Sequence, residues 1–133
     1  MTVRPMMSSD SSPLWEGFVD GLIRIPRCDT CGRCHLPPGP VCPHCFSDAL
    51  SWRRASGRGR ISSWVIVHRK YFEDFDPPYV VVQVELEEGP RLTANMRIDD
   101  LGAIRVGAPV FATFEQAPNG LVLPVFHPDP VAT

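Results

Sequence analysis

The chain has 133 residues, of which 44% are hydrophobic and 21% charged, a composition typical of a folded globular protein rather than a disordered one. Thirteen basic against fifteen acidic side chains give a net charge of −2, which argues against a generally basic nucleic-acid-binding protein. The 15 prolines and 10 glycines disfavour a helix bundle and favour short strands joined by turns. Because we find no apolar run of membrane-helix length and no signal-peptide pattern, we expect a cytoplasmic protein that does not enter a membrane.

The first elements expected along the chain are a disordered arm over residues 1–11 and a short helix. Ser12 and Pro13 suit a helix start. At helical spacing follow the apolar residues Leu14, Trp15, Phe18, Val19 and Leu22, which define one face. This face has two interpretations. It packs against its own domain, or it docks on a partner protein through Trp15 and Phe18.

The five cysteines all lie between positions 28 and 45, and their odd number argues against a disulfide framework. Two Cys-x-x-Cys pairs, separated by ten residues, predict a rubredoxin-like zinc ribbon with four thiolate ligands: Cys28, Cys31, Cys42 and Cys45. We expect one structural Zn²⁺ per chain, with iron as the alternative occupant. Cys34 leaves a second register open. Gly32, directly after Cys31, favours the first register because a knuckle turn needs a left-handed residue, so Cys34, His35 and His44 are expected to be non-ligands.

After a connector at 53–60 the pattern changes to strands, expected at 61–68, 79–87, 91–96, 109–115 and 121–126. The second of these alternates most clearly, with Val80, Val82, Val84 and Leu86 on one face. Asn119-Gly120 is a tight-hairpin signal, and a helical turn is expected at 99–104. Five antiparallel strands with a helical turn between the third and fourth fit an OB-fold barrel.

The fold class predicted is therefore mainly β: a short N-terminal helix, a rubredoxin-like zinc ribbon, and then a five-stranded OB-fold barrel. The helix and ribbon are assigned to residues 12–52 and the barrel to 53–127. An extended, proline-rich tail is assigned to 128–133.

A stretch from Ser51 to Lys70 contains six cations and no acid: Arg53, Arg54, Arg58, Arg60, Arg69 and Lys70. With aromatic residues nearby, it could bind nucleic acid or the phosphates and adenine of coenzyme A. It could also be an ordinary solvated surface.

The sequence contains no nucleophile elbow, no His-Glu-x-x-His motif and no phosphate loop. His68 and His127 are isolated, and no base, nucleophile and orienting group come together. These observations predict a binding or scaffolding module with no catalytic residues of its own.

Several motifs in this order are similar to a known family: Trp15-Glu16-Gly17, Arg27-Cys28-x-x-Cys31-Gly32, Pro37-Pro38-x-x-x-Cys42-Pro43-x-Cys45, Gly57-x-Gly59, Val67-His68-Arg69, Pro77-Pro78-Tyr79-Val80 and Glu88-Gly89-Pro90-Arg91-Leu92. From Pro13 to Phe126 the chain resembles the thiolase-associated zinc-ribbon/OB-fold family, long catalogued as a domain of unknown function. The resemblance implies a zinc ribbon bound through Cys28, Cys31, Cys42 and Cys45. It also implies an accessory subunit of a thiolase-like or lipid-transfer-protein-like enzyme that acts on acyl-CoA thioesters.

One branch of that family partners an aldolase that cleaves steroid side chains as CoA thioesters. Twelve of the thirteen basic residues are arginine, a composition typical of a GC-rich genome in which such pathways are common, so we place the aldolase partner first. A thiolase or acyltransferase partner comes second, and a nucleic-acid-binding OB module is the competing hypothesis. We expect two copies of each subunit, with the partner supplying catalysis. This chain would help line the acyl-CoA channel with Arg69, Lys70, Tyr71, Phe72 and Tyr79.

Overall fold

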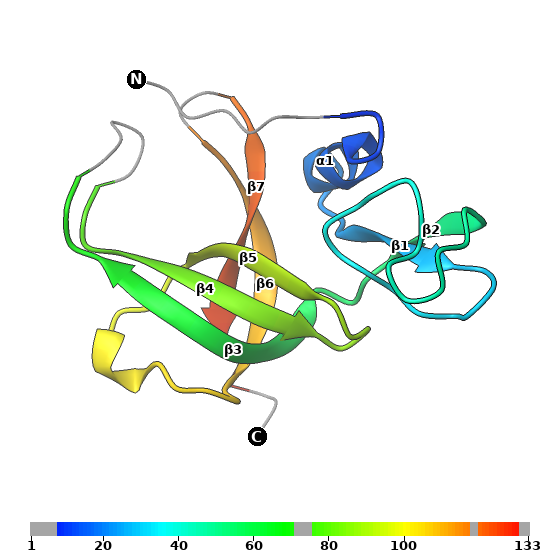
Figure 1. Cartoon of the computed structure of the whole chain (residues 1–133). Helices are drawn as coiled ribbons and strands as arrows, with labels where there is room; N and C mark the ends of the chain where they lie inside the picture. The colour runs from blue at the N-terminus through cyan, green and yellow to red at the C-terminus, as the bar shows by residue number, and fades with distance from the viewer. Residues whose placement is uncertain (1–7, 71–75, 118–119, 131–133) are drawn as a thin grey trace.

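A computed structural model describes residues 8–70, 76–117 and 120–130 of the chain. Its elements are α1 (Ser12–Val19), β1 (Arg24–Cys28), β2 (Leu50–Arg54), β3 (Arg58–Val67), β4 (Tyr79–Leu86), β5 (Arg91–Met96), the 3₁₀ turn η1 (Leu101–Ala103), β6 (Pro109–Gln116) and β7 (Val122–Pro128). Figure 1 shows a β-barrel beside a smaller module of two strands and long loops, with α1 next to both. The structure confirms the predicted mainly β fold.

The smaller module is built on the antiparallel pair β1–β2, in which Cys28 lies opposite Leu50 and Arg24 opposite Arg54. This pairing corrects the expected connector at 53–60. Arg53 and Arg54 belong to β2, and β3 already begins at Arg58, so only residues 55–57 join the two modules. The cysteine loops extend from the end of this pair that carries Cys28 and Leu50.

The larger module is a closed barrel with strand order β3-β4-β5-β7-β6, the order of an OB-fold. Antiparallel ladders join β3 to β4, β4 to β5 and β6 to β7, and β3 also pairs with β6. A short parallel contact between β5 and β7, at Asn95–Val125 and Met96–Phe126, completes the closure. The predicted helical turn between the third and fourth barrel strands is confirmed as η1.

The barrel core follows the period-two pattern expected of β4. Its inward side chains Val80, Val82, Val84 and Leu86 are buried, and Phe126 of β7 is fully enclosed. Gly59 of β3 lies so close to β4 that a Cβ there would be only 2.3 Å from the backbone oxygen of Glu85. The barrel therefore closes tightly because this position has no side chain.

The ends of the barrel sequence differ from expectation in one respect. Pro128, assigned to the tail, is the last residue of β7 and lies opposite Val110 of β6, next to His127 opposite Phe111. The expected hairpin turn contains Asn119, which lies outside the described residues. So do residues 1–7 of the expected N-terminal arm, whereas Ser8 to Ser11 form a hydrogen-bonded turn before α1.

Helix α1 packs between the two modules, in contact with β1 and β7. Phe18 is only 2% exposed, and its ring centroid lies 5.5 Å from that of Trp15 and 6.1 Å from that of Phe114 on β6. Phe18 therefore packs against its own domain, as the first interpretation of this apolar face predicted. Across the part of the chain that the structure describes, no helix is long and apolar enough to cross a membrane.

Candidate metal centre

Two loops of matching backbone geometry carry the four predicted ligands. In the first, the N–H of Gly32 donates to the carbonyl of Cys28 at 2.8 Å. In the second, the N–H of Phe46 donates to the carbonyl of Cys42 at the same distance. Both turns place the residue after the second cysteine at positive φ, +80° for Gly32 and +64° for Phe46. The sequence predicted the first of these from the glycine and could not indicate the second.

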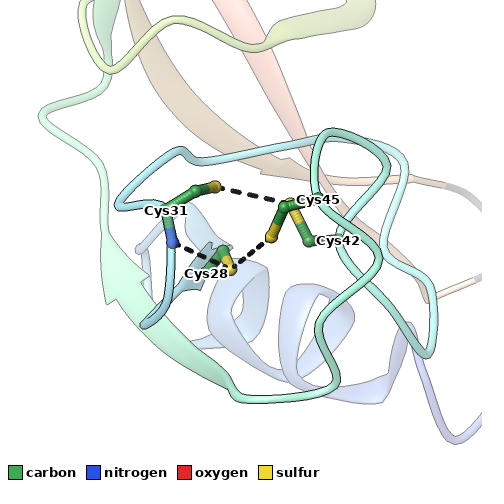
Figure 2. Close-up of side chains that lie close together, drawn as sticks. All are labelled: Cys28, Cys31, Cys42 and Cys45. Atoms are coloured by element: carbon green, nitrogen blue, oxygen red, sulfur yellow. Dashed lines mark hydrogen bonds between the residues drawn. The ribbon is translucent and has the colours of Figure 1, made fainter.

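The four sulfurs converge on one point between the loops (Figure 2). Those of Cys28, Cys31, Cys42 and Cys45 all lie within 4.8 Å of one another. Cys28 Sγ is 3.5 Å from Cys45 Sγ, and Cys31 Sγ is 3.7 Å from Cys42 Sγ. Four thiolates around a tetrahedral zinc, at about 2.3 Å each, stand roughly 3.8 Å apart. The donor set and its spacing therefore fit one zinc ion, as predicted.

Electrostatics explain why this cluster needs a cation. The N–H of Cys31 points at the sulfur of Cys28 (3.4 Å) and is the main cause that lowers the pKa of Cys28 to about 6. At Cys45 the N–H of Ser47 acts in the same sense, but the neighbouring thiols and burial outweigh it and raise the pKa of Cys45 to about 12. Adjacent thiolates repel, so ionisation of one sulfur in the cluster opposes ionisation of its neighbours. A bound dication would remove that repulsion.

Cys34 is outside the sulfur cluster, as the favoured register predicted. Its backbone forms an isolated antiparallel β-bridge with that of Arg27. Burial raises the pKa of its thiol. The backbone N–H of His35 donates to the carbonyl of Pro26, and its ring is buried. With four sulfur ligands the coordination shell is complete, so a zinc ion here is structural and has no open position for substrate.

The structure describes three of the five residues predicted to contact acyl-CoA; Tyr71 and Phe72 lie outside the described residues. Arg69 and Lys70 are exposed just after β3, and Lys70 Nζ lies 3.3 Å from a carboxylate oxygen of Asp76. Tyr79 begins β4 and lines a cavity of about 250 Å³ together with Asn95, Arg97 and Gln116. Two of these residues, Arg69 and Lys70, therefore come just after β3, and Tyr79 begins β4. Their contact with acyl-CoA stays a prediction.

The other cations of the basic stretch are divided between the two modules, and two of them are engaged within the barrel. Arg58 reaches the buried carboxylate of Asp129 at 3.3 Å, and Arg60 donates to the carbonyl of Gly107 at 2.9 Å. Arg53 and Arg54 stand on β2 in the other module. Arg58 and Arg60 therefore each have a partner within the barrel, which lessens their availability to nucleic acid.

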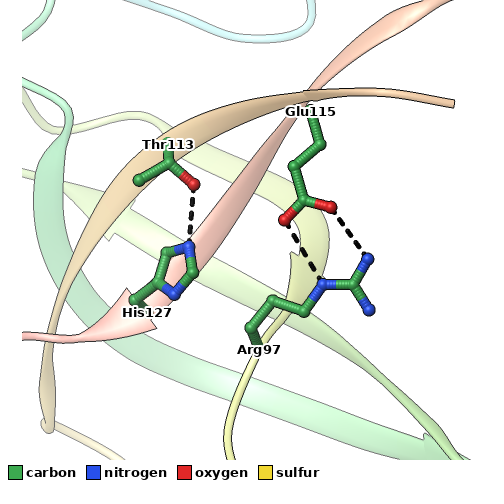
Figure 3. Close-up of polar contacts among 4 residues, drawn as sticks. All are labelled: Arg97, Thr113, Glu115 and His127. Atoms are coloured by element: carbon green, nitrogen blue, oxygen red, sulfur yellow. Dashed lines mark hydrogen bonds and ion pairs between the residues drawn. The ribbon is translucent and has the colours of Figure 1, made fainter.

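A polar cluster that the sequence analysis missed lies on β6, β7 and the residue after β5 (Figure 3). Arg97 donates to both carboxylate oxygens of Glu115, at 2.9 and 3.3 Å, which lowers the pKa of Glu115. Thr113 Oγ1 lies 2.7 Å from His127 Nε2, and the His127 ring stacks on Phe111. Only strand register brings these side chains together, so no local motif could have indicated them.

Trp15 and Phe18, the predicted docking residues, are differently placed. Phe18 is buried in the core. Trp15 is half-buried and lines an apolar groove with Leu92 and Leu123. Docking by these two residues stays a prediction.

A four-cysteine zinc ribbon followed by an OB barrel defines a class of two-module zinc-ribbon/OB-fold proteins. Comparison with known families agrees with both modules. Residues 15–51 match the model described as "ChsH2, rubredoxin-like zinc ribbon domain", and residues 52–115 match "ChsH2, C-terminal OB-fold domain". The chain belongs to this ChsH2 (DUF35) family.

Three relatives give this assignment its detail. In the solved "Ltp2-ChsH2(DUF35) aldolase", one chain is 37% identical with a TM-score of 0.87, over 94% of this chain and 98% of that one. A "Probable enoyl-CoA hydratase alpha subunit" of Thermomonospora curvata is 37% identical over 94% of this chain and 39% of its own length. The "3-oxo-4,17-pregnadiene-20-carboxyl-CoA hydratase alpha subunit" of Mycobacterium tuberculosis is 32% identical over 88% and 37%. The chain thus spans about two-fifths of the length of the two hydratase subunits.

Proposed function

We propose that this chain is a non-catalytic subunit that docks on and activates a thiolase-like acyl-CoA enzyme. The enzyme we favour is an aldolase that cleaves a C–C bond in the side chain of a steroid CoA thioester. The observation that carries the proposal is the match to the chain of the Ltp2-ChsH2(DUF35) aldolase, which this chain covers over 98% of its length with a TM-score of 0.87.

The chemistry of the described residues supports an accessory role. A zinc ion held by four thiolates has no position left for substrate. His127, the histidine of the polar cluster, is hydrogen-bonded to Thr113 and stacked on Phe111. In the proposed assembly the partner therefore supplies the catalytic groups, while this chain contributes shape and recognition. We expect two copies of each subunit.

The acyl-CoA contact is proposed at one end of the barrel. Arg69 and Lys70 follow β3, and Tyr79 begins β4 beside the cavity that contains Arg97. Cations at this position would receive CoA phosphates, and the Tyr79 ring would pack on adenine or on the acyl group. Lys70 also has a carboxylate oxygen of Asp76 within 3.3 Å of its Nζ.

The test of the main proposal is co-expression with the product of the neighbouring gene, which we expect to be a thiolase-like enzyme, followed by co-purification and an assay of retro-aldol cleavage. We expect a stable complex and activity that neither subunit shows alone. Turnover by the isolated zinc-loaded chain, or the absence of any complex, would contradict the proposal. If the complex catalyses thiolysis and not aldol cleavage, the proposed accessory role stands and the proposed reaction is wrong.

The CoA contact has its own test. Replacing Arg69 and Lys70 together by alanine should raise KM for the thioester about tenfold in the complex with little change in kcat, because ground-state phosphate contacts are removed. Arg105→Ala is the matched control, since Arg105 is exposed on a different loop. Unchanged kinetics in the double variant would remove these residues from the site.

A second candidate function is favoured by the two relatives named as hydratase alpha subunits. In that case the same barrel would serve an enoyl-CoA hydratase assembly. Supplying the co-purified complex with an enoyl-CoA and following loss of the conjugated double bond by its absorbance distinguishes the two, because aldol cleavage consumes the hydrated product instead.

A further inference from the structure

The two cysteine loops differ at one position in a way that their backbone does not explain. Each needs a left-handed residue directly after its second cysteine, and the hydrogen bonds made there are the same. The first loop uses Gly32 at φ +80°, and the second uses Phe46 at φ +64°. Glycine adopts this conformation without a steric cost, whereas phenylalanine does not. The phenylalanine therefore gives the second loop a steric cost in conformational free energy that a glycine would avoid.

Among the residues that the structure describes, Phe46 finds no burial that would offset this steric cost. Its side chain is 78% exposed, although a phenylalanine contributes to stability mainly by being buried. The backbone around it is held by two hydrogen bonds of 2.8 Å, from the N–H of Phe46 to the carbonyl of Cys42 and from the N–H of Cys42 to the carbonyl of Ser47. The Ser47 hydroxyl also lies 2.9 Å from the hydroxyl of Thr30 on the opposite loop. A solvent-exposed aromatic ring on a strained, hydrogen-bonded turn beside the candidate metal site is pre-organised for contact with another molecule.

The charges beside Phe46 indicate what that molecule is. Asp48 follows two positions later, and Asp29 adjoins the pair Thr30–Ser47. Both aspartates are exposed, and within the described ranges neither makes an ion pair. Carboxylates here repel nucleic acid and anionic lipid, and they oppose a symmetric contact with a second copy of the same acidic patch. Arg33, a cation of this module, contacts the His44 ring at 3.4 Å and not the carboxylates of Asp29 and Asp48.

We propose that Phe46 is an anchor for the enzyme partner, inserting into an apolar pocket of that protein bordered by lysine or arginine side chains that face Asp29 and Asp48. This inference rests on the proposed function and adds to it the contact residue and the chemistry of the partner's surface. Aromatic anchors of this kind contribute a large share of the affinity of an interface. The carboxylates at the edge would mainly set the association rate and its salt dependence.

The decisive variant is Phe46→Gly, because it separates stability from binding. In the isolated, zinc-loaded chain we expect an unchanged Tm or an increase of up to about 3 °C, as strain is relieved, with one zinc retained per chain. Affinity for the co-purified thiolase-like enzyme, measured by biolayer interferometry, should fall tenfold or more through faster dissociation. A residue needed only for folding could not produce this pair of opposite effects.

Val106→Ala removes another exposed apolar side chain, 68% exposed on the barrel, and should leave affinity within twofold. Replacing Asp29 and Asp48 by asparagine should slow association and flatten its salt dependence. If the wild-type chain binds the enzyme and Phe46→Gly binds equally well, this inference is wrong and the proposed function stands. If the wild-type chain does not bind, both are wrong.

Discussion

The ribbon and the barrel reach a stable fold by different means. The ribbon has one two-stranded ladder and fully buried residues at only a few positions, among them Ile25, Cys28 and Cys42. The barrel closes its five strands into a ring around Val82, Val84 and Phe126. A module of some 40 residues rarely folds without a metal or disulfides, whereas a closed barrel has no free edges and a continuous core. The metal therefore takes the place of a core in one half of the molecule only.

Removing the metal should have the largest effect on stability, and this effect should be confined to the ribbon. Zinc binding by four thiolates is worth on the order of 10 kcal/mol, so chelation should unfold the ribbon and leave the barrel strands in place. Amide exchange would show loss of protection over residues 24–54 and retention over 79–96. Cys42→Ala should behave like chelation, while Cys34→Ala should keep one zinc per chain. Global unfolding on chelation would show that the barrel depends on the ribbon.

The corresponding experiment on the barrel is Gly59→Ala. The added Cβ would meet the Glu85 oxygen at 2.3 Å, so β3 and β4 must separate, at a cost of about 1–3 kcal/mol. We expect a lower urea midpoint with the zinc content unchanged. Gly39→Ala is the matched control, because nothing lies within 4 Å of a Cβ there. Equal stability of the two variants would mean that the barrel relaxes at this point.

The smallest expected effect comes from the ion pair on the barrel surface. Arg97 lowers the pKa of Glu115 below its unfolded value, so the pair stabilises the fold above the ordinary glutamate range and loses this effect as the pH falls through the lowered pKa. Both side chains are well exposed, which limits the coupling to about 0.5 kcal/mol. A double-mutant cycle with Arg97→Ala and Glu115→Ala measures it, and acid release of zinc cancels because all four proteins share it. A coupling unchanged from pH 7 to pH 3 would contradict the assignment.

Local patterns in the sequence were enough to predict much of this structure. The cysteine spacing was enough to predict the ligands, because two short turns impose the sulfur geometry themselves. The alternation of β4 was enough to predict its buried face. In contrast, the β1–β2 ladder was missed at Arg53 and Arg54, since adjacent exposed arginines look like a connector. The Arg97–Glu115 and Thr113–His127 contacts depend on which strands become neighbours, which no local segment specifies.

Phe46 shows a further limit. Its conformation is imposed by the fold of the second loop, not by its own preference. The available signal was a comparison within the chain: a glycine follows Cys31, whereas a phenylalanine follows Cys45. Only the structure shows that the two positions are equivalent, because only there do their φ values and hydrogen bonds coincide.

The position of α1 restricts how the two halves can be used separately. The helix lies against β1 and β7 at once, and Phe18 is shared by both neighbourhoods. A cut in the three residues between Arg54 and Arg58 would leave the helix on the ribbon fragment and uncover the Phe114 side of the barrel. Anyone transplanting the barrel into another protein would need to carry this helix along or replace the exposed aromatic surface with polar residues.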